Sequence, residues 1–552
     1  MKALICALNT KYIHSSLSPW YLKASLKELY PDVECEIYES TINESEKTLL
    51  EEISKRRADI ICFSAYIWNI SLVLSLGEAL SRVKDAKILL GGPEVSYNSE
   101  DLLEKYPFID YIISGEGERP FAELCGAEVP LSEIPGLCYR DNGKIIVKPP
   151  HISSDDPPSP YNDEYLEALN GRISYIETSR GCPYRCAFCL SGRCGGVRFF
   201  DIERSKRDIL FLAGSGSKTI KFIDRTFNAD KKRAKELFSF IIDNSCDKIP
   251  DDVCFHFEIE GDILDDELIE LLSRARTGLF QMEIGLQSFN PQTLNAINRK
   301  TNMERLCENI KKLIALGNIH IHIDLIAGLP YESVESLENS FNKAISLRAH
   351  VLQLGFLKLL HGADMREKRE LYPCEYRSDA PYEVIATPWL SSEELDQLHI
   401  IEDFFDKFYN SGRFRRTEQY IFEAVENPFK FYTGLAVFVK KNQKSHSLDE
   451  LSRCVYEYLC GTDFLDKRLV RDFMAMDRLS TNRMGALPEF LKIHSSKLKE
   501  YLNLLEQNPE TRAKRGIKRA ITLLESENAF VYVDYDSENK VTKEYKIIKY
   551  II

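Results

Sequence analysis

The sequence lacks any apolar run that approaches the roughly 20 residues needed to cross a bilayer, so we expect no transmembrane helix and no membrane partner. It also lacks an excess of basic residues. Lysine and arginine number 72 against 85 aspartates and glutamates, and the net charge of −13 argues against a general binder of nucleic acid or anionic membranes. Residues 1–8 lack a small-residue cleavage site after their short apolar run, so we expect a β-strand there and not a signal peptide.

The cysteines lack the even number and the regular spacing of a disulfide framework. Fifteen of them are scattered along the chain, which is typical of a protein kept in the reducing cytosol, so we predict a cytoplasmic location. Hydrophobic residues make up 44% of the chain and charged residues 28%, an ordinary composition for a soluble protein. A length of 552 residues predicts two to four domains.

Three cysteines, Cys182, Cys186 and Cys189, stand at the spacing C-x3-C-x2-C. A structural zinc site normally has four ligands, often as two C-x2-C pairs, and no second pair follows at the usual distance. Iron–sulfur clusters of the 4Fe–4S type normally have four cysteine ligands, so three thiolates would leave one iron open to another ligand. Three buried free cysteines, or a zinc knuckle completed by Cys194, are the alternatives.

This segment resembles the signature of the radical S-adenosylmethionine (radical SAM) superfamily, which has an aromatic residue, here Phe188, before the last cysteine. The resemblance implies that Cys182, Cys186 and Cys189 ligate a 4Fe–4S cluster and that SAM chelates its open iron through amino and carboxylate groups. It further implies that an electron from the cluster cleaves SAM to methionine and a 5′-deoxyadenosyl radical.

Residues 1 to about 125 alternate short apolar strands with amphipathic helices, which predicts a flavodoxin-like, doubly wound parallel sheet. The expected strands are 3–8, 33–38, 60–63, 88–90 and 109–113. Ligands of such sheets bind outside the carboxyl ends of the strands. Two of these ends carry glycine-rich turns, at residues 91–94 and 115–118, where bare backbone can approach a ligand closely.

A strand ending in Gly-Gly-Pro-Glu and a later Gly-Glu-Gly-Glu, upstream of the cysteines, resemble the cobalamin-binding domain of B12-dependent radical SAM proteins. The resemblance implies that residues 12–17 lie near the corrin and that five residues surround the nucleotide tail: Ser64, Tyr66, Gly91, Gly92 and Glu94. The cobalt-ligating D-x-H-x-x-G sequence of the family is absent, so His14 is not assigned as a cobalt ligand. A flavodoxin-like domain with a purely structural role is the alternative.

A proline-rich stretch divides this first domain, residues 1–148, from the next, and we predict a linker over residues 149–170. The second domain, residues 171–365, has strands expected at 174–178, 220–223, 253–258, 281–285, 319–326 and 351–356, with helical segments between them. Six β/α units match the partial TIM-type barrel of radical SAM enzymes. Catalytic groups of such barrels collect at the carboxyl ends of the strands.

Four polar residues at those ends resemble the SAM contacts of the family. The resemblance implies that Asp224 binds the SAM amino group, that Glu258 is a further acidic contact and that Gln287, in a G-x-Q-S turn, lies near SAM. Asp324, in D-L-I-x-G-L-P, would accept hydrogen bonds from the ribose hydroxyls. A surface carboxylate or a helix cap is the alternative for each single acidic residue. Arg185 and Arg193 lie beside the cysteines, where they would tune the cluster or hold a carboxylate, or are merely solvated.

The barrel pattern stops near residue 366, and residues 366–552 predict a mainly α-helical C-terminal domain. Helical patterns run from Ser391 to about Ser526, and alternating residues at 529–535 and 542–551 predict a terminal β-hairpin. This region resembles the uncharacterised C-terminal domain of one bacterial group of B12-type radical SAM proteins.

Together these patterns predict a cytoplasmic radical SAM enzyme that uses a 4Fe–4S cluster, SAM and cobalamin, with methyl transfer to an unactivated centre as the expected reaction. A rearrangement or oxidation without methyl transfer, and a cofactor-binding protein without turnover, are the alternatives. We expect an electron donor such as flavodoxin or ferredoxin as the partner and no nucleic acid. The sequence predicts no substrate.

Overall fold

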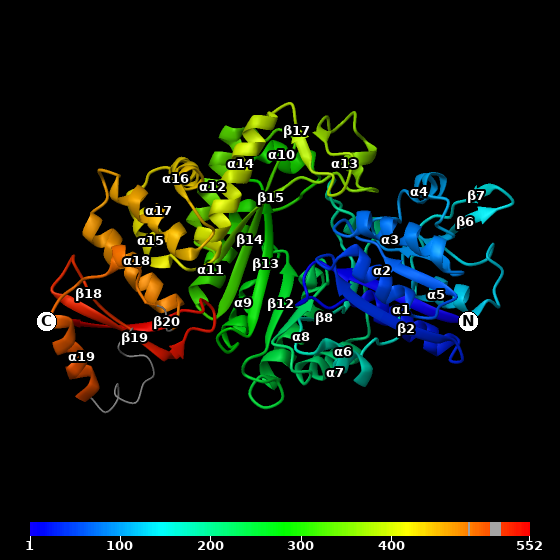
Figure 1. Cartoon of the computed structure of the whole chain (residues 1–552), viewed down its shortest axis with the longest axis horizontal. Coiled ribbons are helices and arrows are strands. Elements are labelled where there is room, and N and C mark those ends of the chain that lie inside the picture. Colours follow the sequence, from blue (N-terminus) through cyan, green and yellow to red (C-terminus); the bar gives the residue numbers. More distant parts are fainter. Residues whose placement is uncertain (484–485, 508–519, 552) are drawn as a thin grey trace. The chain divides into compact units, whose positions relative to one another are not determined.

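The computed structural model describes residues 1–483, 486–507 and 520–551 (Figure 1). The chain forms two compact units. The first holds residues Met1–Gln281, Asn295–Thr301 and Phe356–Pro388, and the second holds Met282–Leu294, Asn302–Gly355 and Trp389–Ile552. No helix of the described residues is long and apolar enough to cross a membrane.

The N-terminal part of the first unit is a seven-stranded sheet with the order β2-β1-β3-β4-β5-β6-β7. Its strands are β1 (Lys2–Asn9), β2 (Glu34–Thr41), β3 (Ile60–Ser64), β4 (Lys87–Gly91), β5 (Tyr111–Ile113), β6 (Leu137–Asp141) and β7 (Lys144–Ile146). The first five strands are parallel, as the alternation of strands and helices predicts. β3 is buried along its whole length, which explains its continuous apolar run Ile-Ile-Cys-Phe.

Helices cover both faces of this sheet and give it two hydrophobic cores. The helices are α1 (Ser18–Leu29), α2 (Glu46–Ser54), α3 (Ile70–Val83), α4 (Ser99–Lys105) and α5 (Glu118–Gly126). Residues of α2, α3 and α4 pack with one set of strand side chains, and residues of α1 and α5 pack with the other. This two-faced burial confirms the predicted doubly wound fold.

At the edge of the sheet lies an antiparallel hairpin, β6–β7, that was not predicted. Its turn is Asn142-Gly143, and both residues have positive φ, 47° and 79°. Asn-Gly between two short strands is a strong signal for a two-residue hairpin turn, so the pattern was present in the sequence. The predicted linker also contains a helix, α6 (Asp163–Leu169). It forms because the Asn162 side chain caps it by accepting from the Tyr165 amide, at 2.9 Å.

A second sheet has six strands in the order β15-β14-β13-β12-β11-β8, and this confirms the expected partial barrel. The strands are β8 (Ser174–Ile176), β11 (Thr219–Phe222), β12 (Cys254–Ile259), β13 (Phe280–Gln287), β14 (Ile319–Ala327) and β15 (Val351–Phe356). Helices of this part of the chain are α7 (Ile202–Ala213), α8 (Lys231–Asn244), α9 (Asp266–Ser273), α10 (Pro291–Ala296), α11 (Met303–Leu316) and α12 (Val334–Ser346), with the 3₁₀ turn η2 (Phe227–Ala229). Buried and half-buried residues alternate along β13 and β14, as expected when only one face of a strand packs against helices.

The boundary predicted at residue 366 falls within the segment that follows β15, and it stays a prediction. Residues 356–388 belong to the first unit and contain α13 (Asp364–Glu367), β16 (Glu375–Tyr376) and β17 (Val384–Ala386). Hydrogen bonds join this segment to other parts of the first unit. The Met365 amide donates to the Ala187 carbonyl, and the Tyr372 hydroxyl donates to the Ala296 carbonyl.

The C-terminal part of the second unit is mainly helical, as predicted. It holds α14 (Ser392–Phe405), the π-turn η3 (Asp406–Asn410), α15 (Arg415–Ala424), α16 (Pro428–Asn442), α17 (Leu448–Cys460), α18 (Lys467–Thr481), the 3₁₀ turn η4 (Glu489–Leu491) and α19 (Lys497–Gln507). A capping box of Ser391 and Glu394 starts α14. The terminal hairpin is confirmed as β19 (Ala529–Glu538) and β20 (Tyr545–Ile551).

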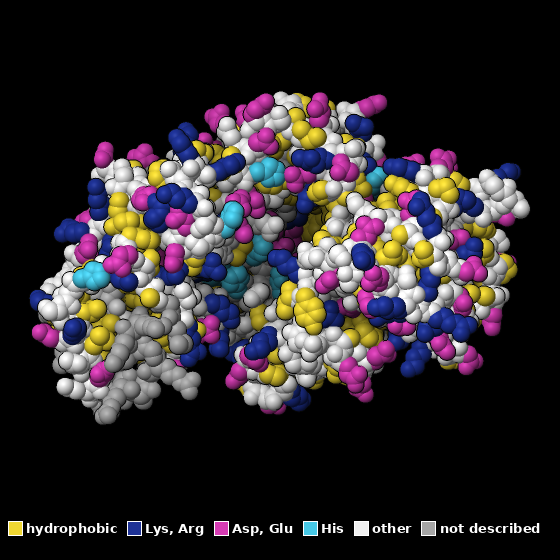
Figure 2. All heavy atoms as spheres, viewed as in Figure 1, with side chains coloured by type: hydrophobic (Ala, Val, Ile, Leu, Met, Phe, Trp, Pro, Cys, Tyr) yellow, Lys and Arg dark blue, Asp and Glu magenta, His cyan; other side chains and the backbone are white. Residues whose placement is uncertain are grey.

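The predicted continuation of helix to residue 526 is wrong at β18 (Ile521–Leu523), which pairs with β19 because both strands bury apolar side chains. Residues 508–519 of that prediction lie outside the described residues. On the face shown in Figure 2, basic and acidic side chains are interspersed over the parts of the chain that are drawn in colour.

Candidate functional site

The three cysteines of the signature lie on one loop of the first unit. The loop leaves β9 (Ser179–Gly181), passes through the 3₁₀ turn η1 (Ser191–Cys194) and returns as β10 (Val197–Phe199), which pairs antiparallel with β9. Cys182, Cys186 and Cys189 are half-buried free thiols. The side chain of Cys194, the alternative fourth zinc ligand, lies outside the described side chains.

This cysteine loop is folded tightly on itself and is tied to two other segments. A Cβ on Gly192 would lie 2.3 Å from the Tyr184 carbonyl oxygen, so only glycine fits there. The Ala187 amide donates to the Ile297 carbonyl at 2.9 Å, and its carbonyl accepts from the Met365 amide at 3.0 Å. Arg193 pairs with Asp364 at 3.0 Å and with Glu367. The loop therefore has a fixed shape before any ligand binds.

The chemistry of the loop fits an iron–sulfur cluster better than a single ion. Among the described side chains, no three His, Cys, Asp or Glu residues converge closely enough to hold one metal ion. The thiolates of a 4Fe–4S cluster each bind a different iron and so do not converge on one point. Three half-buried thiols on one preformed loop can each bind a different iron. A structural zinc ion instead needs ligands that converge on one point.

Asp224, predicted to bind the SAM amino group, is buried and holds the entrance of the cysteine loop. Its carboxylate accepts from the Thr178 amide at 2.9 Å, the Thr178 hydroxyl at 2.7 Å and the Ser179 hydroxyl at 2.6 Å. Burial raises the pKa of Asp224 to about 6, and the hydrogen bonds from Ser179 and Thr178 oppose that rise. The structure thus gives this carboxylate a positioning role, and its contact with SAM stays a prediction.

Glu258, the second predicted acidic contact, is partly exposed at the end of β12. It pairs with Arg225 at 3.8 Å, and its side chain is 26% exposed. Arg225 is itself exposed and is one of the residues around a cavity of this unit with a volume of about 690 Å³. Glu258 therefore remains accessible to a ligand, unlike Asp224.

Arg299 and Glu260 are buried neighbours of the cysteine loop that the sequence analysis missed. Arg299 lies close enough to Cys186 to affect the pKa of its thiol, and it donates from Nη2 to Glu260 Oε2 at 2.8 Å. Burial raises the pKa of the Cys186 thiol, and the guanidinium beside it acts in the opposite direction. Burial raises the pKa of Glu260 to about 7, again against the effect of Arg299.

A cavity of about 690 Å³ lies at the carboxyl ends of β3, β4 and β5. Its lining includes Ser64, Tyr66, Gly91 and Gly92, four of the five residues predicted around the nucleotide tail. It also includes residues on both sides of the cysteines, namely Ser179, Arg180, Gly181, Leu190 and Ser191. Its size is within the range of roughly 300–1,000 Å³ typical of ligand sites.

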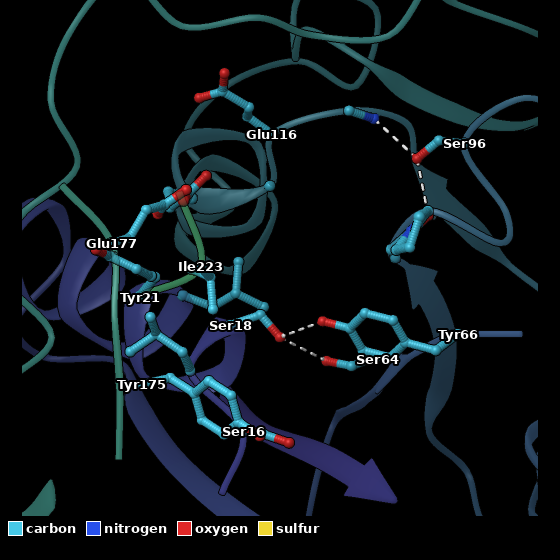
Figure 3. Close-up of a pocket in the computed structure, with 18 of the residues that line it drawn as sticks. Ser16, Ser18, Tyr21, Ser64, Tyr66, Ser96, Glu116, Tyr175, Glu177 and Ile223 are labelled. Atoms are coloured by element: carbon cyan, nitrogen blue, oxygen red, sulfur yellow. Dashed lines mark hydrogen bonds between the residues drawn. The ribbon is translucent and has the colours of Figure 1, made fainter. Parts of the chain in front are cut away.

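The cavity wall is rich in hydroxyl groups (Figure 3). The Ser18 hydroxyl lies 3.4 Å from the hydroxyls of both Ser64 and Tyr66. Ser96 joins the two glycine-rich turns, because its hydroxyl donates to the Gly92 carbonyl at 2.8 Å and accepts from the Gly115 amide at 3.1 Å. The Tyr21 hydroxyl is buried at the cavity and has no hydrogen-bond partner among the described residues.

These features fit a large polar ligand. A Cβ on Gly91 would meet nothing within 4 Å, so open space lies directly over the backbone of that turn. An unpaired buried hydroxyl such as that of Tyr21 costs free energy unless a ligand or water satisfies it. His14 lines the same cavity, and its Nδ1 is 2.7 Å from the Tyr175 hydroxyl. It is still not assigned as a cobalt ligand.

A buried charge network closes one wall of the cavity. Arg180 pairs with Glu116 at 2.8 Å, with Glu118 at 2.9 Å and with Glu177 at 2.8 Å. Burial alone would raise the pKa of Glu118, but the Arg180 guanidinium outweighs it and lowers that pKa. Since Glu116 and Glu118 belong to the second glycine-rich turn, Arg180 fixes that turn to the strand that enters the cysteine loop.

Glu94, the fifth residue predicted around the nucleotide tail, points elsewhere. It is buried and accepts a hydrogen bond from the Tyr382 hydroxyl, and it is not among the lining residues of the cavity. Burial raises the pKa of Glu94, while the Tyr382 hydrogen bond lowers it. Its predicted cofactor contact remains untested.

Gln287 and Asp324 belong to the second unit. Gln287 ends β13 with φ of 68°, and its amide oxygen is buried without a hydrogen-bond partner among the described residues. The next residue, Ser288, donates to the fully buried Glu332. Asp324 pairs with His322 at 3.0 Å, and its side chain is 20% exposed. Their contacts with SAM stay predictions.

Comparison with protein families divides the chain into three parts. Residues 4–125 match the B12-binding domain model, and residues 176–344 match the model of the radical SAM superfamily. The chain thus contains a B12-binding domain followed by a radical SAM domain. Residues 370–547 match a protein family of unknown function, DUF4080, which agrees with the predicted uncharacterised C-terminal domain.

Known proteins are similar to this chain over part of their length. The chain is 28% identical over 273 residues to an uncharacterized methyltransferase of Pyrococcus horikoshii, covering 47% of this chain and 58% of that protein. It is 25% identical over 328 residues to the cobalamin-dependent radical SAM methyltransferase TokK of Streptomyces tokunonensis, covering 54% and 47%. The chain thus spans about half the length of the curated relatives it matches.

A solved structure shares the fold over most of the chain. It is that of OxsB, a cobalamin-dependent SAM radical enzyme with aqua-cobalamin and SAM bound, with a TM-score of 0.60 at 15% identity. The match covers 86% of this chain and 78% of OxsB. The B12-binding and radical SAM domains of this chain therefore have the architecture expected from the sequence.

Proposed function

We propose that this chain is a radical SAM enzyme that binds a 4Fe–4S cluster, SAM and cobalamin and transfers a methyl group to an unactivated centre. The observation that carries the proposal is one cavity of the first unit, with a volume of about 690 Å³. It is lined both by the glycine-rich turns of the B12-binding domain and by the residues on either side of the signature cysteines. The similarity to cobalamin-dependent methyltransferases supports methyl transfer over the other radical SAM reactions.

Each cofactor has residues of suitable chemistry. Cys182, Cys186 and Cys189 would hold the cluster on their preformed loop. Ser64, Tyr66, Gly91 and Gly92 would border cobalamin, with the unpaired Tyr21 hydroxyl as a further donor or acceptor. Glu258, Gln287 and Asp324 are the candidates for SAM, and Asp224 would act through the loop that it holds. When bound, the cluster supplies one electron for reductive cleavage of SAM, and cobalamin supplies a carrier for a methyl group.

The protein itself orients the bound groups and excludes bulk water from them. Asp224 fixes Thr178 and Ser179, so the strand that enters the cysteine loop does not shift. Arg180 holds the second glycine-rich turn beside that strand. The glycine-rich turns let the backbone approach a ligand, and the surrounding apolar and hydroxyl side chains exclude bulk water from it.

We further propose a cytoplasmic location and an electron donor such as flavodoxin or ferredoxin. The cysteines whose side chains are described are all free thiols, which supports a reducing compartment. Among the described residues, the hollow beside Cys182, with the exposed Arg185 and Phe199, is a suitable surface for an acidic donor protein. The substrate is not assigned.

The test is anaerobic reconstitution with iron, sulfide and hydroxocobalamin, followed by dithionite and SAM. 5′-Deoxyadenosine, S-adenosylhomocysteine, bound cobalamin and bound iron are quantified. We expect cobalamin and about four irons per chain, deoxyadenosine, and S-adenosylhomocysteine from the methyl-transfer cycle. Deoxyadenosine without S-adenosylhomocysteine would favour a rearrangement or oxidation, and a loaded protein that yields neither product would favour the cofactor-binding alternative.

Matched cysteine variants make the test specific. Cys186→Ala should lose both the cluster and SAM cleavage, because a cluster held by two thiolates is not retained. Cys246→Ala removes an exposed thiol outside the cysteine loop and should leave both unchanged. SAM cleavage by Cys186→Ala would disprove the assignment of the cluster ligands.

A further inference from the structure

Arg299 brings a buried positive charge to the cysteine loop from a distant part of the sequence. The ring of Tyr184, two residues before Cys186, lies 6.0 Å from the guanidinium carbon, and the guanidinium is close enough to the Cys186 thiol to affect its pKa. Arg299 and Glu260 are only 11% and 4% exposed, and they pair at 2.8 Å. Solvent therefore screens these two charges much less than it screens surface charges.

The surrounding backbone fixes both side chains. The Asn228 amide group donates to the Glu260 carbonyl at 2.8 Å and accepts from the Glu260 amide at 2.8 Å. On the other side, the Ile297 carbonyl accepts from the Ala187 amide, which joins the segment that carries Arg299 to the centre of the cysteine loop. The backbone that carries each residue is thus fixed, and the 2.8 Å ion pair holds the two side chains to each other.

We propose that Arg299 raises the reduction potential of the cluster bound at Cys182, Cys186 and Cys189 and that Glu260 limits this rise. The inference rests on the cluster of the proposed function. Reduction adds one negative charge to a cluster that already carries the charge of three thiolates. A buried cation close to a ligand sulfur stabilises the reduced form of the cluster, and a buried carboxylate beside it has the opposite effect.

The arginines that the sequence alone places beside the cluster are poorly suited to this role. Arg185 is exposed, and Arg193 is 32% exposed and already paired with Asp364 and Glu367. Solvent and these two carboxylates weaken the field of Arg193 at the cluster. Arg193→Gln is therefore a matched control, because it removes the same charge from a nearby but screened position, while the Ala187 backbone bonds and the close packing at Gly192 still hold the cysteine loop.

The test compares the wild type with Arg299→Gln, Glu260→Gln, Arg299→Lys and Arg193→Gln. Each protein is reconstituted anaerobically without SAM or cobalamin, and iron and sulfide are counted. The midpoint potential is then measured at pH 8.5 by a redox titration followed by electron paramagnetic resonance. We expect a more negative potential for Arg299→Gln, a more positive one for Glu260→Gln and an unchanged one for Arg193→Gln. Arg299→Lys keeps the charge and should shift the potential less than Arg299→Gln.

The expected shifts in midpoint potential have opposite signs for Arg299→Gln and Glu260→Gln. Loss of packing would not reverse the sign of the shift between these two variants, so the comparison identifies a charge effect. Equal potentials in all loaded proteins, or shifts of Arg299→Gln and Glu260→Gln in the same direction, would overturn the inference. If Arg299→Gln fails to hold the cluster, Glu260→Gln and Arg299→Lys decide the outcome. A wild type that holds no cluster would instead overturn the proposed function and this inference together, so the two failures are distinguishable.

Discussion

The hydroxyl of Tyr382 donates a hydrogen bond to the carboxylate of Glu94, although the two residues are 288 positions apart in the sequence. Both side chains are buried in the first unit. Glu94 is the last residue of the glycine-rich turn after β4, and Tyr382 lies in the segment that follows the last barrel strand. The contact therefore attaches this segment to the B12-binding domain.

Tyr382→Phe should destabilise the first unit. The substitution keeps the ring and leaves the buried Glu94 carboxylate without its hydroxyl donor, which costs about 1–3 kcal/mol. Urea denaturation of wild type and variant at the same pH measures the loss. Tyr376→Phe is the control, because its hydroxyl makes no hydrogen bond among the described residues. Equal stability of Tyr382→Phe and the wild type would show that water replaces the lost donor.

Asp224 should make the stability of the protein depend on pH between about 4 and 6. Its pKa rises from 3.8 to about 6 on folding, so the folded chain binds a proton more tightly than the unfolded chain. This stabilisation is complete below the unfolded pKa and is lost as pH rises through the folded pKa, by about 3 kcal/mol in all. The free energy of unfolding of the wild type should therefore fall over this range relative to that of Asp224→Asn.

Urea denaturation of both proteins at several pH values from 4 to 7 measures this difference. Asp243→Asn, at an exposed carboxylate of α8, corrects for general effects of removing one charge. If the free energies of unfolding of the wild type and Asp224→Asn differ by the same amount at every pH from 4 to 7, Asp224 is ionised throughout that range.

Local patterns made the fold and the cluster ligands predictable. A buried parallel strand needs an apolar run, and residues 60–63 show one, so β3 was predicted within one residue of its true end. The spacing of Cys182, Cys186 and Cys189 is a local feature, since one short loop must present all three thiols. Gly91 and Gly92 were predicted for the same reason, because the carboxyl end of a strand is marked in the sequence.

Partners that come from distant segments could not be predicted. Nothing near Arg299 in the sequence indicates that it reaches Cys186, because that contact depends on how residues 295–301 fold back onto the cysteine loop. Tyr382 and Glu94 meet for a similar reason. Asp224 shows the opposite case: its place at a strand end was predicted correctly, but Thr178 and Ser179 occupy its oxygens.

Gly192→Ala should prevent cluster binding. The new Cβ would lie 2.3 Å from the Tyr184 carbonyl oxygen, and that backbone atom cannot move without reshaping the cysteine loop. Iron content and the visible absorption of the reconstituted protein measure the effect. Gly214→Ala is the control, because its Cβ would meet only atoms at 3.6 Å or beyond. Normal iron binding by Gly192→Ala would show that the loop adapts to the extra methyl group.

Gln287 allows backbone strain and SAM binding to be separated. Its φ of 68° costs a residue with a Cβ about 1 kcal/mol or more, and glycine avoids that cost. Gln287→Gly should therefore be at least as stable as Gln287→Ala in thermal denaturation, since alanine keeps the strain. Both variants lose the side-chain amide of Gln287. Both should therefore bind SAM more weakly than the wild type in equilibrium dialysis of the cluster-loaded protein. Wild-type SAM affinity in both variants would show that Gln287 makes no contact with SAM and that its conformation serves only to place Ser288 against Glu332.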